Sequence, residues 1–278
     1  MDGFTDRQKR EFKRNGFLVR QDVLDDDLVA RASEAVWEGI PYDRDDHEAL
    51  VETPERIENA WDHVEDPEPF AEINRRLAPY AETLIRGDIE PPGEGIQLAL
   101  RFPSGQQSDD DPFPEPHREH GHIDGYGPSF DRNHEVGHFQ VGAAVYLDRV
   151  EPRGGGFTVW PGSHYHAGAY YEDNHLESLV GHPTLPGLEL DDDGEWTGGF
   201  ERCERYDEQF DPLEIHGPAG SVVFWHGALQ HCGGVNRSRN LRLSAIKRFR
   251  REDTDEIKRD SFAHPFEYLD LDDVELAP

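Results

Sequence analysis

The sequence has 278 residues, 35% of them hydrophobic and 10% aromatic, so it is long enough to bury the core of one large domain or two small ones. Its 59 acidic residues outnumber 28 basic residues, which gives a formal net charge of −31. This charge argues against partners that are nucleic acids or anionic membranes, and no apolar run approaches the ~20 residues of a membrane span.

The acidic residues are spread along the whole chain, whereas lysine occurs at only four positions. A surface rich in aspartate and poor in lysine suits a cell interior full of salt, where self-repulsion is screened. We therefore predict a halophilic protein, with an ordinary acidic enzyme of a mesophile as the alternative. The N-terminal segment has no apolar signal core, so we also expect a cytoplasmic location. The two cysteines form no CxxC pair and predict neither a disulfide framework nor a zinc site.

Helical signals dominate the first third of the chain. Thr5 is a candidate N-cap for a first helix, and Gly16 is a candidate C-terminal stop. A second helix follows the acidic run 25–27, with apolar residues at helical spacing, and a third is expected over about 69–85. These helices are expected to pack outside whatever core the rest of the chain forms.

Short strands separated by glycine and proline turns follow. The predicted strands are 96–102, 139–147, 156–160, 221–225 and 241–249. The segment 188–200 is rich in Asp and Gly and is predicted to be a surface loop. The acidic end of the chain, from residue 252, is predicted to be a loosely docked tail. The pattern indicates an all-β core with flanking helices, built as a sandwich or barrel.

A possible metal site begins in the segment HREHGHIDGYG. On an extended strand, His122 and Asp124 would point to the same face, about 6–7 Å apart along the chain. Two histidines and one carboxylate make a facial triad that leaves three positions open on a first-row divalent metal. An HxD pair alone is a weak signal in an acidic, histidine-rich segment, so the prediction depends on a further histidine elsewhere.

The sequence about a hundred residues later supplies candidates for the rest of the site. A predicted strand ends in a turn that carries His226 and His231. The next strand has Arg242 and Ser244 on one face, between apolar residues of the other face. An unpaired guanidinium there would be costly, and an anion is the obvious partner, since arginine binds carboxylates through two parallel hydrogen bonds.

Three motifs together resemble the phytanoyl-CoA dioxygenase family of Fe(II)- and 2-oxoglutarate-dependent oxygenases. They are HxD, then GGGFTVWPGSH at 154–164, then HCGGVNRSRNLR from His231 to Arg242. The resemblance spans roughly residues 5–249. It implies a double-stranded β-helix, a cupin-like jelly roll, with one oxygenase domain over 1–278. That domain would have a mainly helical part (1–90), a jelly-roll core (91–250) and an acidic tail (251–278).

The resemblance also implies a role for each matched residue. His122, Asp124 and His231 match the iron ligands, and Arg242 matches the arginine that holds the far carboxylate of 2-oxoglutarate. Ser244 matches the second residue of an RxS pair, while Gln97 and Arg101 are candidates for further contacts with 2-oxoglutarate. The implied reaction uses O2 to hydroxylate a small organic substrate, with release of succinate and CO2. A monomer or small homo-oligomer is expected.

Several alternatives stay open on the sequence alone. His120 could replace His122 as a ligand, whereas His226 is better suited to a core role beside the site. The same barrel could serve a cupin-like metal-dependent isomerase or hydrolase that uses no 2-oxoglutarate, or a binding protein without turnover. Arg242 and Ser244 distinguish the first of these, because such an enzyme has no need of a carboxylate clamp.

Overall fold

The structure is a computed structural model that describes residues 3–54, 56–105, 123–124, 139–165, 188–190, 196–198, 212–264, 266–271 and 274. Its helices are α1 (Asp6–Asn15), α2 (Asp26–Gly39), α3 (His47–Glu52), the 3-10 turn η1 (Trp61–His63), α4 (Glu68–Glu82) and α7 (Thr254–Ala263). Its strands are β1 (Phe17–Arg20), β2 (Gln97–Arg101), β3 (Val141–Tyr146), β4 (Phe157–Val159), β5 (Leu188–Leu190), β6 (Trp196–Gly198), β7 (Leu213–Ile215), β8 (Val222–His226), β9 (His231–Gly233) and β10 (Arg242–Phe249). Among the described helices, none is both long and apolar enough to cross a bilayer.

The predicted limits of the first helix are confirmed. Thr5 and Gln8 form a capping box: the backbone N–H of Gln8 donates to the Thr5 side chain, and the Gln8 side chain accepts from the Thr5 backbone. Gly16 ends the helix in the left-handed region, with φ +80°, and its N–H donates to the carbonyl of Phe12. The chain then turns directly into β1, which places α1 beside the edge of the main sheet.

Two antiparallel sheets form the core. The larger has the strand order β1-β8-β3-β10-β2, and the smaller has the order β7-β4-β9. The long strand β10 pairs with β2 on one side, with Arg242 opposite Arg101, and with β3 on the other, with Arg248 opposite Gly142. Because alternate residues of a strand point to opposite faces, this register decides which side chains of β10 face the smaller sheet.

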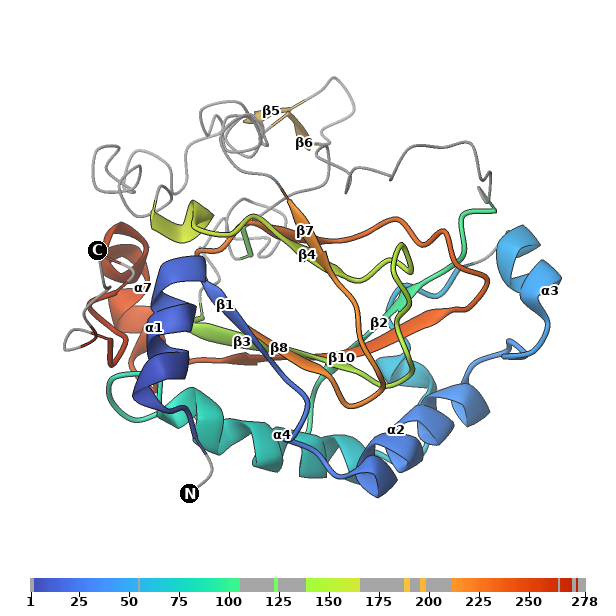
Figure 1. The fold of residues 1–278 in the computed structure, drawn as a ribbon, viewed down its shortest axis with the longest axis horizontal. Helices are drawn as coiled ribbons and strands as arrows, with labels where there is room; N and C mark the ends of the chain where they lie inside the picture. Colours follow the sequence, from blue (N-terminus) through green and yellow to red (C-terminus); the bar gives the residue numbers. More distant parts are fainter. Residues whose placement is uncertain are drawn as a thin grey trace.

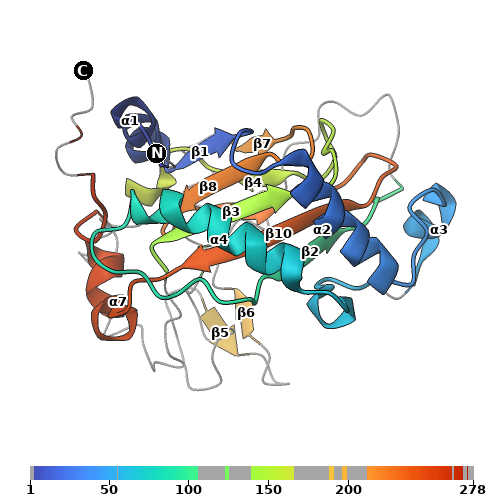
Figure 2. The same cartoon turned by 90° about the horizontal axis from the view of Figure 1, so that it is seen from below.

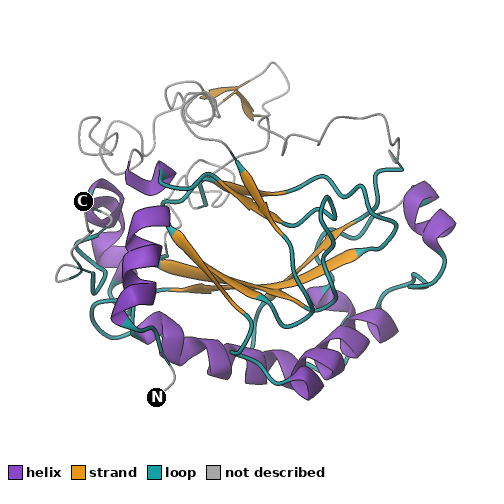
Figure 3. Ribbon diagram, in the orientation of Figure 1, coloured by secondary structure: helices purple, strands orange, loops and turns teal. Residues whose placement is uncertain are grey.

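The molecule is layered, with α2 and α4 covering the outer face of the larger sheet (Figures 1 and 2). One apolar cluster joins these helices to that face and includes Leu243 and Ala245 of β10. A second cluster fills the space between the two sheets and includes Tyr146, Phe157 and Trp225. Figure 3 shows the two sheets lying one above the other, with helices on the outside. The predicted β core with flanking helices is therefore confirmed at this level.

Two predictions about the less regular parts were wrong. Within 188–200, expected to be a loop, β5 and β6 pair as an antiparallel hairpin. The segment has short runs with Leu, Trp and Thr on either side of an Asp- and Gly-rich stretch, which is a hairpin pattern. The C-terminal part is not a loosely docked tail either: it contains α7, and Leu269 and Leu271 are buried. These two leucines alternate with acidic residues in the sequence. The high charge of the segment therefore masked the apolar side chains by which it packs.

Candidate metal and oxo-acid site

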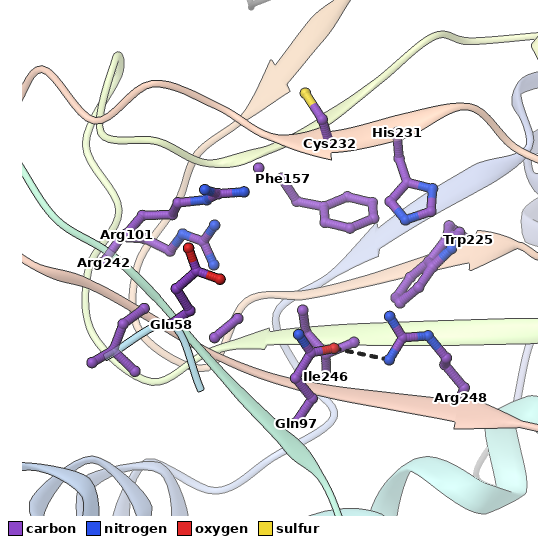
Figure 4. A pocket seen from close by; sticks show the side chains of 13 residues that line it. Glu58, Gln97, Arg101, Phe157, Trp225, His231, Cys232, Arg242, Ile246 and Arg248 are labelled. Carbon is purple, nitrogen blue, oxygen red and sulfur yellow. Dashed lines mark hydrogen bonds between the residues drawn. The ribbon is translucent and has the colours of Figure 1, made fainter. Parts of the chain in front are cut away.

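A cavity of about 160 Å³ lies between the two sheets. Gln97, Arg242 and Arg248 reach it from the larger sheet, and Phe157 and His231 reach it from the smaller one (Figure 4). The strands supply these side chains from opposite sides, so the cavity exists only because the sheets face each other. Its two ends differ in chemistry.

At one end, the structure brings together two of the three predicted metal ligands. The Nε2 atom of His231 lies 3.6 Å from Oδ2 of Asp124, and both side chains are almost completely buried. They are 107 positions apart in sequence. His231 is the first residue of β9, whereas Asp124 lies in a turn outside the named strands. The extended strand that the HxD prediction assumed is therefore not present at Asp124.

The orientation of His231 is set by its other ring nitrogen. Nδ1 lies 2.9 Å from the backbone carbonyl oxygen of Leu229, a distance at which Nδ1–H donates to that oxygen. The lone pair of the neutral ring is then at Nε2, facing Asp124. The ring is stacked on Phe157, with centroids 5.0 Å apart, and packs on Trp225 at 5.4 Å. These contacts fix the imidazole in one position.

These two groups fit a divalent metal ion. A nitrogen and an oxygen 3.6 Å apart are close enough to hold one divalent ion together, and these are donor types that such ions accept. The third predicted ligand, His122, lies outside the described residues, as do His117 and the alternative ligand His120. In the part of the chain that is described, there is accordingly no group of three metal-binding side chains.

At the other end of the cavity lies Arg242, which is only 5% exposed. Its Nε–H donates to the carbonyl of Gly155 at 2.9 Å, and its Nη1 donates to Oγ of Ser244 at 2.8 Å. Within the described ranges, no carboxylate forms an ion pair with this guanidinium. Burial lowers the pKa of Arg242 to about 10, which leaves it charged at neutral pH. Ser244 thus contacts Arg242 directly.

The Gly155 carbonyl, which accepts the Arg242 hydrogen bond, lies in a turn that the Glu214 side chain stabilises. Gly155 adopts φ +75°, and a Cβ there would lie 2.9 Å from Asn236. The carboxylate of Glu214 accepts hydrogen bonds from the backbone N–H groups of Arg153 and Gly156, at 2.9 and 2.8 Å. Glycine is therefore needed at 155 to bring a backbone oxygen close to the buried guanidinium.

A second arginine lines the same end of the cavity. Arg101 lies directly opposite Arg242 in the β2–β10 pair, and a Cβ on Gly233 would be 2.4 Å from its Nε (Figure 4). Two guanidinium groups opposite each other repel, and Arg101 contributes to the lowered pKa of Arg242. Glu58 also lines the cavity, but no ion pair joins it to either arginine among the described residues. This end of the cavity is suited to an anion.

Gln97 lines the cavity on the side of Arg248 and His231. Its Oε1 accepts a hydrogen bond from Nη1 of Arg248 at 2.9 Å. Both predicted auxiliary residues, Gln97 and Arg101, therefore reach the cavity, at different positions along it.

The neighbouring motif residues have structural roles. His226 is buried, packs 5.2 Å from the ring of His164, and its Nδ1 accepts from the backbone of Ala228. Asn236 is buried and donates to the carbonyls of Arg101 and Asn240 at 2.8 and 2.7 Å. Asn236 thus ties the loop before β10 to the end of β2 and holds Arg101 and Arg242 in register.

The sequence analysis missed Arg248, Phe157 and Trp225 as residues that line the cavity. Arg248 follows Arg242, Ser244 and Ile246 at a spacing of two, so strand periodicity could have identified it. Phe157 and Trp225 had no comparable signal, because apolar residues in buried strands are common on both faces of a sheet. Their position became evident only when the two sheets were brought together.

The sequence profile described as Phytanoyl-CoA dioxygenase (PhyH) matches residues 12–244. The chain belongs to the phytanoyl-CoA dioxygenase family. The match includes Asp124, His231 and Arg242 and every residue that lines the cavity except Ile246 and Arg248. Iron and 2-oxoglutarate are the cofactors that this membership implies, and they agree with the two ends of the cavity. No curated protein matched the sequence.

Solved structures with a similar fold include EctD and AviO1. EctD from S. alaskensis, crystallised with 2-oxoglutarate and 5-hydroxyectoine, is 19% identical, with a TM-score of 0.57 over 89% of this chain and 76% of EctD. AviO1 from Streptomyces viridochromogenes Tue57 is also 19% identical, with a TM-score of 0.51 over 88% of this chain and 94% of AviO1. At this identity the likeness concerns the fold.

Proposed function

We propose that the protein is an Fe(II)- and 2-oxoglutarate-dependent dioxygenase that hydroxylates a small organic substrate, with release of succinate and CO2. The fold is assigned as a double-stranded β-helix that carries this site as one oxygenase domain. The observation that carries the proposal is a buried guanidinium, Arg242, which forms no ion pair with a carboxylate among the described residues and lies across the cavity from His231 and its neighbour Asp124. An oxo acid with a carboxylate at each end would span these two sites.

The metal end provides a nitrogen and a carboxylate oxygen at a suitable separation, and His122 is the proposed third ligand. Fe(II) bound there would supply the activation of O2 that is coupled to oxidative decarboxylation of 2-oxoglutarate. The protein contributes a neutral His231 with its lone pair directed at the site, and a carboxylate, Asp124, which keeps the ligand count at three. Halogenating relatives lack this carboxylate, so its presence favours hydroxylation.

Arg242 would bind the far carboxylate of 2-oxoglutarate. Two of its N–H groups are already used by Gly155 and Ser244, which hold the guanidinium in one plane, and the others remain for the anion. In a cavity walled by Phe157 and Trp225, water competes poorly for these donors. Arg101, beside Arg242, adds positive charge to the same end.

The two alternative functions use the same barrel differently. A cupin-like isomerase or hydrolase would need the metal ligands but not a buried arginine across the cavity that forms no ion pair among the described residues. A binding protein without turnover would need neither the preset tautomer of His231 nor its contact with Asp124. The combination of both ends in one cavity favours the oxygenase.

Anaerobic titration tests the proposal. Fe(II) and 2-oxoglutarate added to the purified protein should give a weak visible charge-transfer band, and admission of O2 with a metabolite mixture should produce succinate. Asp124→Ala should abolish succinate formation, and Arg242→Gln should remove the band at 2-oxoglutarate concentrations that saturate the parent. Arg75→Gln, an exposed arginine of α4, serves as the control. Full activity of Asp124→Ala would refute the metal site.

A further inference from the structure

Arg248 contacts the predicted metal ligand Asp124 more closely than His231 does. Its Nε and Nη2 atoms each lie 2.7 Å from Oδ2 of Asp124. Its Nη1 donates to Gln97 at 2.9 Å, the bond that is drawn as a dashed line in Figure 4. Charge-assisted hydrogen bonds of this length are among the stronger polar contacts in proteins. The guanidinium therefore holds the carboxylate at a defined angle to the cavity.

The position of Arg248 is itself fixed from several sides. Its backbone lies in β10 opposite Gly142 of β3, and its guanidinium carbon is 5.7 Å from the ring centroid of Phe139. The side chain of Arg248 is 31% exposed, whereas that of Asp124 is 3% exposed. Water is thus largely removed from the carboxylate, and the guanidinium replaces it as the hydrogen-bonding partner.

We propose that Arg248 is a positioning residue that fixes Asp124 as a metal ligand through one oxygen. The inference rests on the proposed function. Oδ2 already accepts the Nε–H bond and lies 2.7 Å from Nη2, so a carboxylate that turned both oxygens toward the metal would have to weaken these contacts. Ligation through one oxygen leaves three metal positions open, two for the oxo acid and one for O2. Gln97 acts one step further out, by orienting Arg248.

Two effects of Arg248 on metal affinity oppose each other. Its positive charge repels a cation, which weakens binding, whereas its hydrogen bonds hold the ligand oxygen in place, which strengthens binding. Partners that hydrogen-bond to metal ligands typically contribute about 10- to 100-fold to metal affinity. We infer that positioning outweighs repulsion, because two guanidinium nitrogens lie 2.7 Å from the carboxylate oxygen and the guanidinium is held in turn by Gln97 and Phe139.

Anaerobic Fe(II) titration of the full-length protein separates these effects. Arg248→Gln should weaken Fe(II) binding by about 10- to 100-fold. Arg248→Lys keeps the charge but loses the two-pronged contact, so its affinity should lie between those of the parent and Arg248→Gln. In the Fe(II)-saturated variants, 2-oxoglutarate titrated against the charge-transfer band should bind less tightly, because Asp124 is then able to occupy a second metal position.

Arg250→Gln is the matched control, because Arg250 lies two residues further on and pairs with the exposed Asp255. It should bind Fe(II) as the parent does. Thermal unfolding without metal establishes that each variant is folded. Equal or tighter Fe(II) binding by a folded Arg248→Gln would overturn the inference and leave the proposed function standing. Failure of the parent itself to bind Fe(II) would instead overturn the proposed function.

Discussion

The charged guanidinium of Arg242 is buried, and burying a charge costs free energy. It is 5% exposed, and its hydrogen bonds in the described structure go to neutral partners, Gly155 and Ser244. Burying a cation without an acid costs several kcal/mol even after relaxation, at about the level of a whole protein's marginal stability. We expect such a residue to destabilise the ligand-free protein, and under the proposed function the carboxylate of the oxo acid would offset this cost. Arg242 is therefore the single side chain that most restricts which ligand the cavity takes.

The lowered pKa of Arg242 predicts how 2-oxoglutarate binding depends on pH. The anion needs the protonated guanidinium, and burial lowers the pKa of that group to about 10 in the free protein. The apparent Kd should therefore be constant from about pH 7 to about pH 9 and rise about tenfold per pH unit well above that pKa. Binding of 2-oxoglutarate to the Fe(II)-loaded protein, read from the charge-transfer band, measures this.

The control for the pH profile is Arg242→Gln, which has no titrating guanidinium at this position. Its weak residual binding should not show the same alkaline limb. If the parent and Arg242→Gln lose affinity in parallel as pH rises, a different group causes the loss.

At the scale of elements, the site depends on how closely the indole of Trp225, from β8, approaches the backbone of the neighbouring strand β3. Trp225 of β8 lies flat against β3, because a Cβ on Gly142 would be only 2.2 Å from its indole. The ring then packs between Phe139 and Phe157, with centroids 5.8 and 4.8 Å away, and reaches His231. Glycine is unfavourable in the middle of a buried strand. At position 142 it leaves space for the Trp225 indole, which a larger side chain would fill.

Gly142→Ala should therefore disturb both stability and the metal end. The added methyl group forces the indole toward the cavity, and overpacking of this kind costs about 1–3 kcal/mol in the free energy of unfolding. Urea unfolding followed by tryptophan fluorescence measures the loss. Gly95→Ala is the control, since a Cβ there meets nothing within 4 Å, and its effect should stay within about 0.5 kcal/mol. Equal stabilities of the two variants would contradict the close approach of Trp225.

At the scale of the whole molecule, the C-terminal region closes the structure against its N-terminal helix. Nζ of Lys13 donates to the carbonyls of Leu271 and Val274 at 2.8 and 3.0 Å, and Lys9 pairs with Asp270 at 2.8 Å. Leu269 is completely buried and belongs to the same apolar cluster as α2 and α4. Two of the four lysines of the chain are thus used to dock an acidic segment onto an apolar surface.

Leu269→Ala should consequently destabilise the whole domain and not only its end. Removing a buried leucine side chain costs about 2–5 kcal/mol, depending on how far the surroundings collapse. Chemical denaturation monitored by far-ultraviolet circular dichroism measures this. Leu213→Ala is the matched control, because Leu213 is 47% exposed and its truncation should be close to neutral. A loosely docked tail would instead make both variants neutral.

The net charge of −31 predicts a stability that increases with salt. Repulsion among the acids opposes the compact state, and the Debye length falls from about 10 Å at 0.1 M to about 3 Å at 1 M salt. The thermal unfolding midpoint should therefore rise as KCl is added to molar concentrations, as expected of a halophilic protein. A midpoint that is highest in dilute buffer and falls steadily with KCl would exclude this adaptation.

The sequence by itself determined the helices at the start of the chain, the main strands and the chemistry of the site residues. Capping residues, strand alternation and the spacing of His231, Arg242 and Ser244 are local properties, and local properties can be read along a chain. The same alternation also separated the cavity-facing side of β10 from its helix-facing side. These parts of the prediction needed no knowledge of which segments meet.

Only the tertiary structure decided what each site residue contacts. Asp124 approaches His231 across 107 positions, and it is held by Arg248, which comes from a third segment of the chain. Arg101 and Arg242 meet because β2 pairs with β10 in one particular register. Such contacts depend on sheet pairing and on two sheets packing face to face. The energy of that packing is spread over many apolar side chains, none of which carries a local signature of its partner.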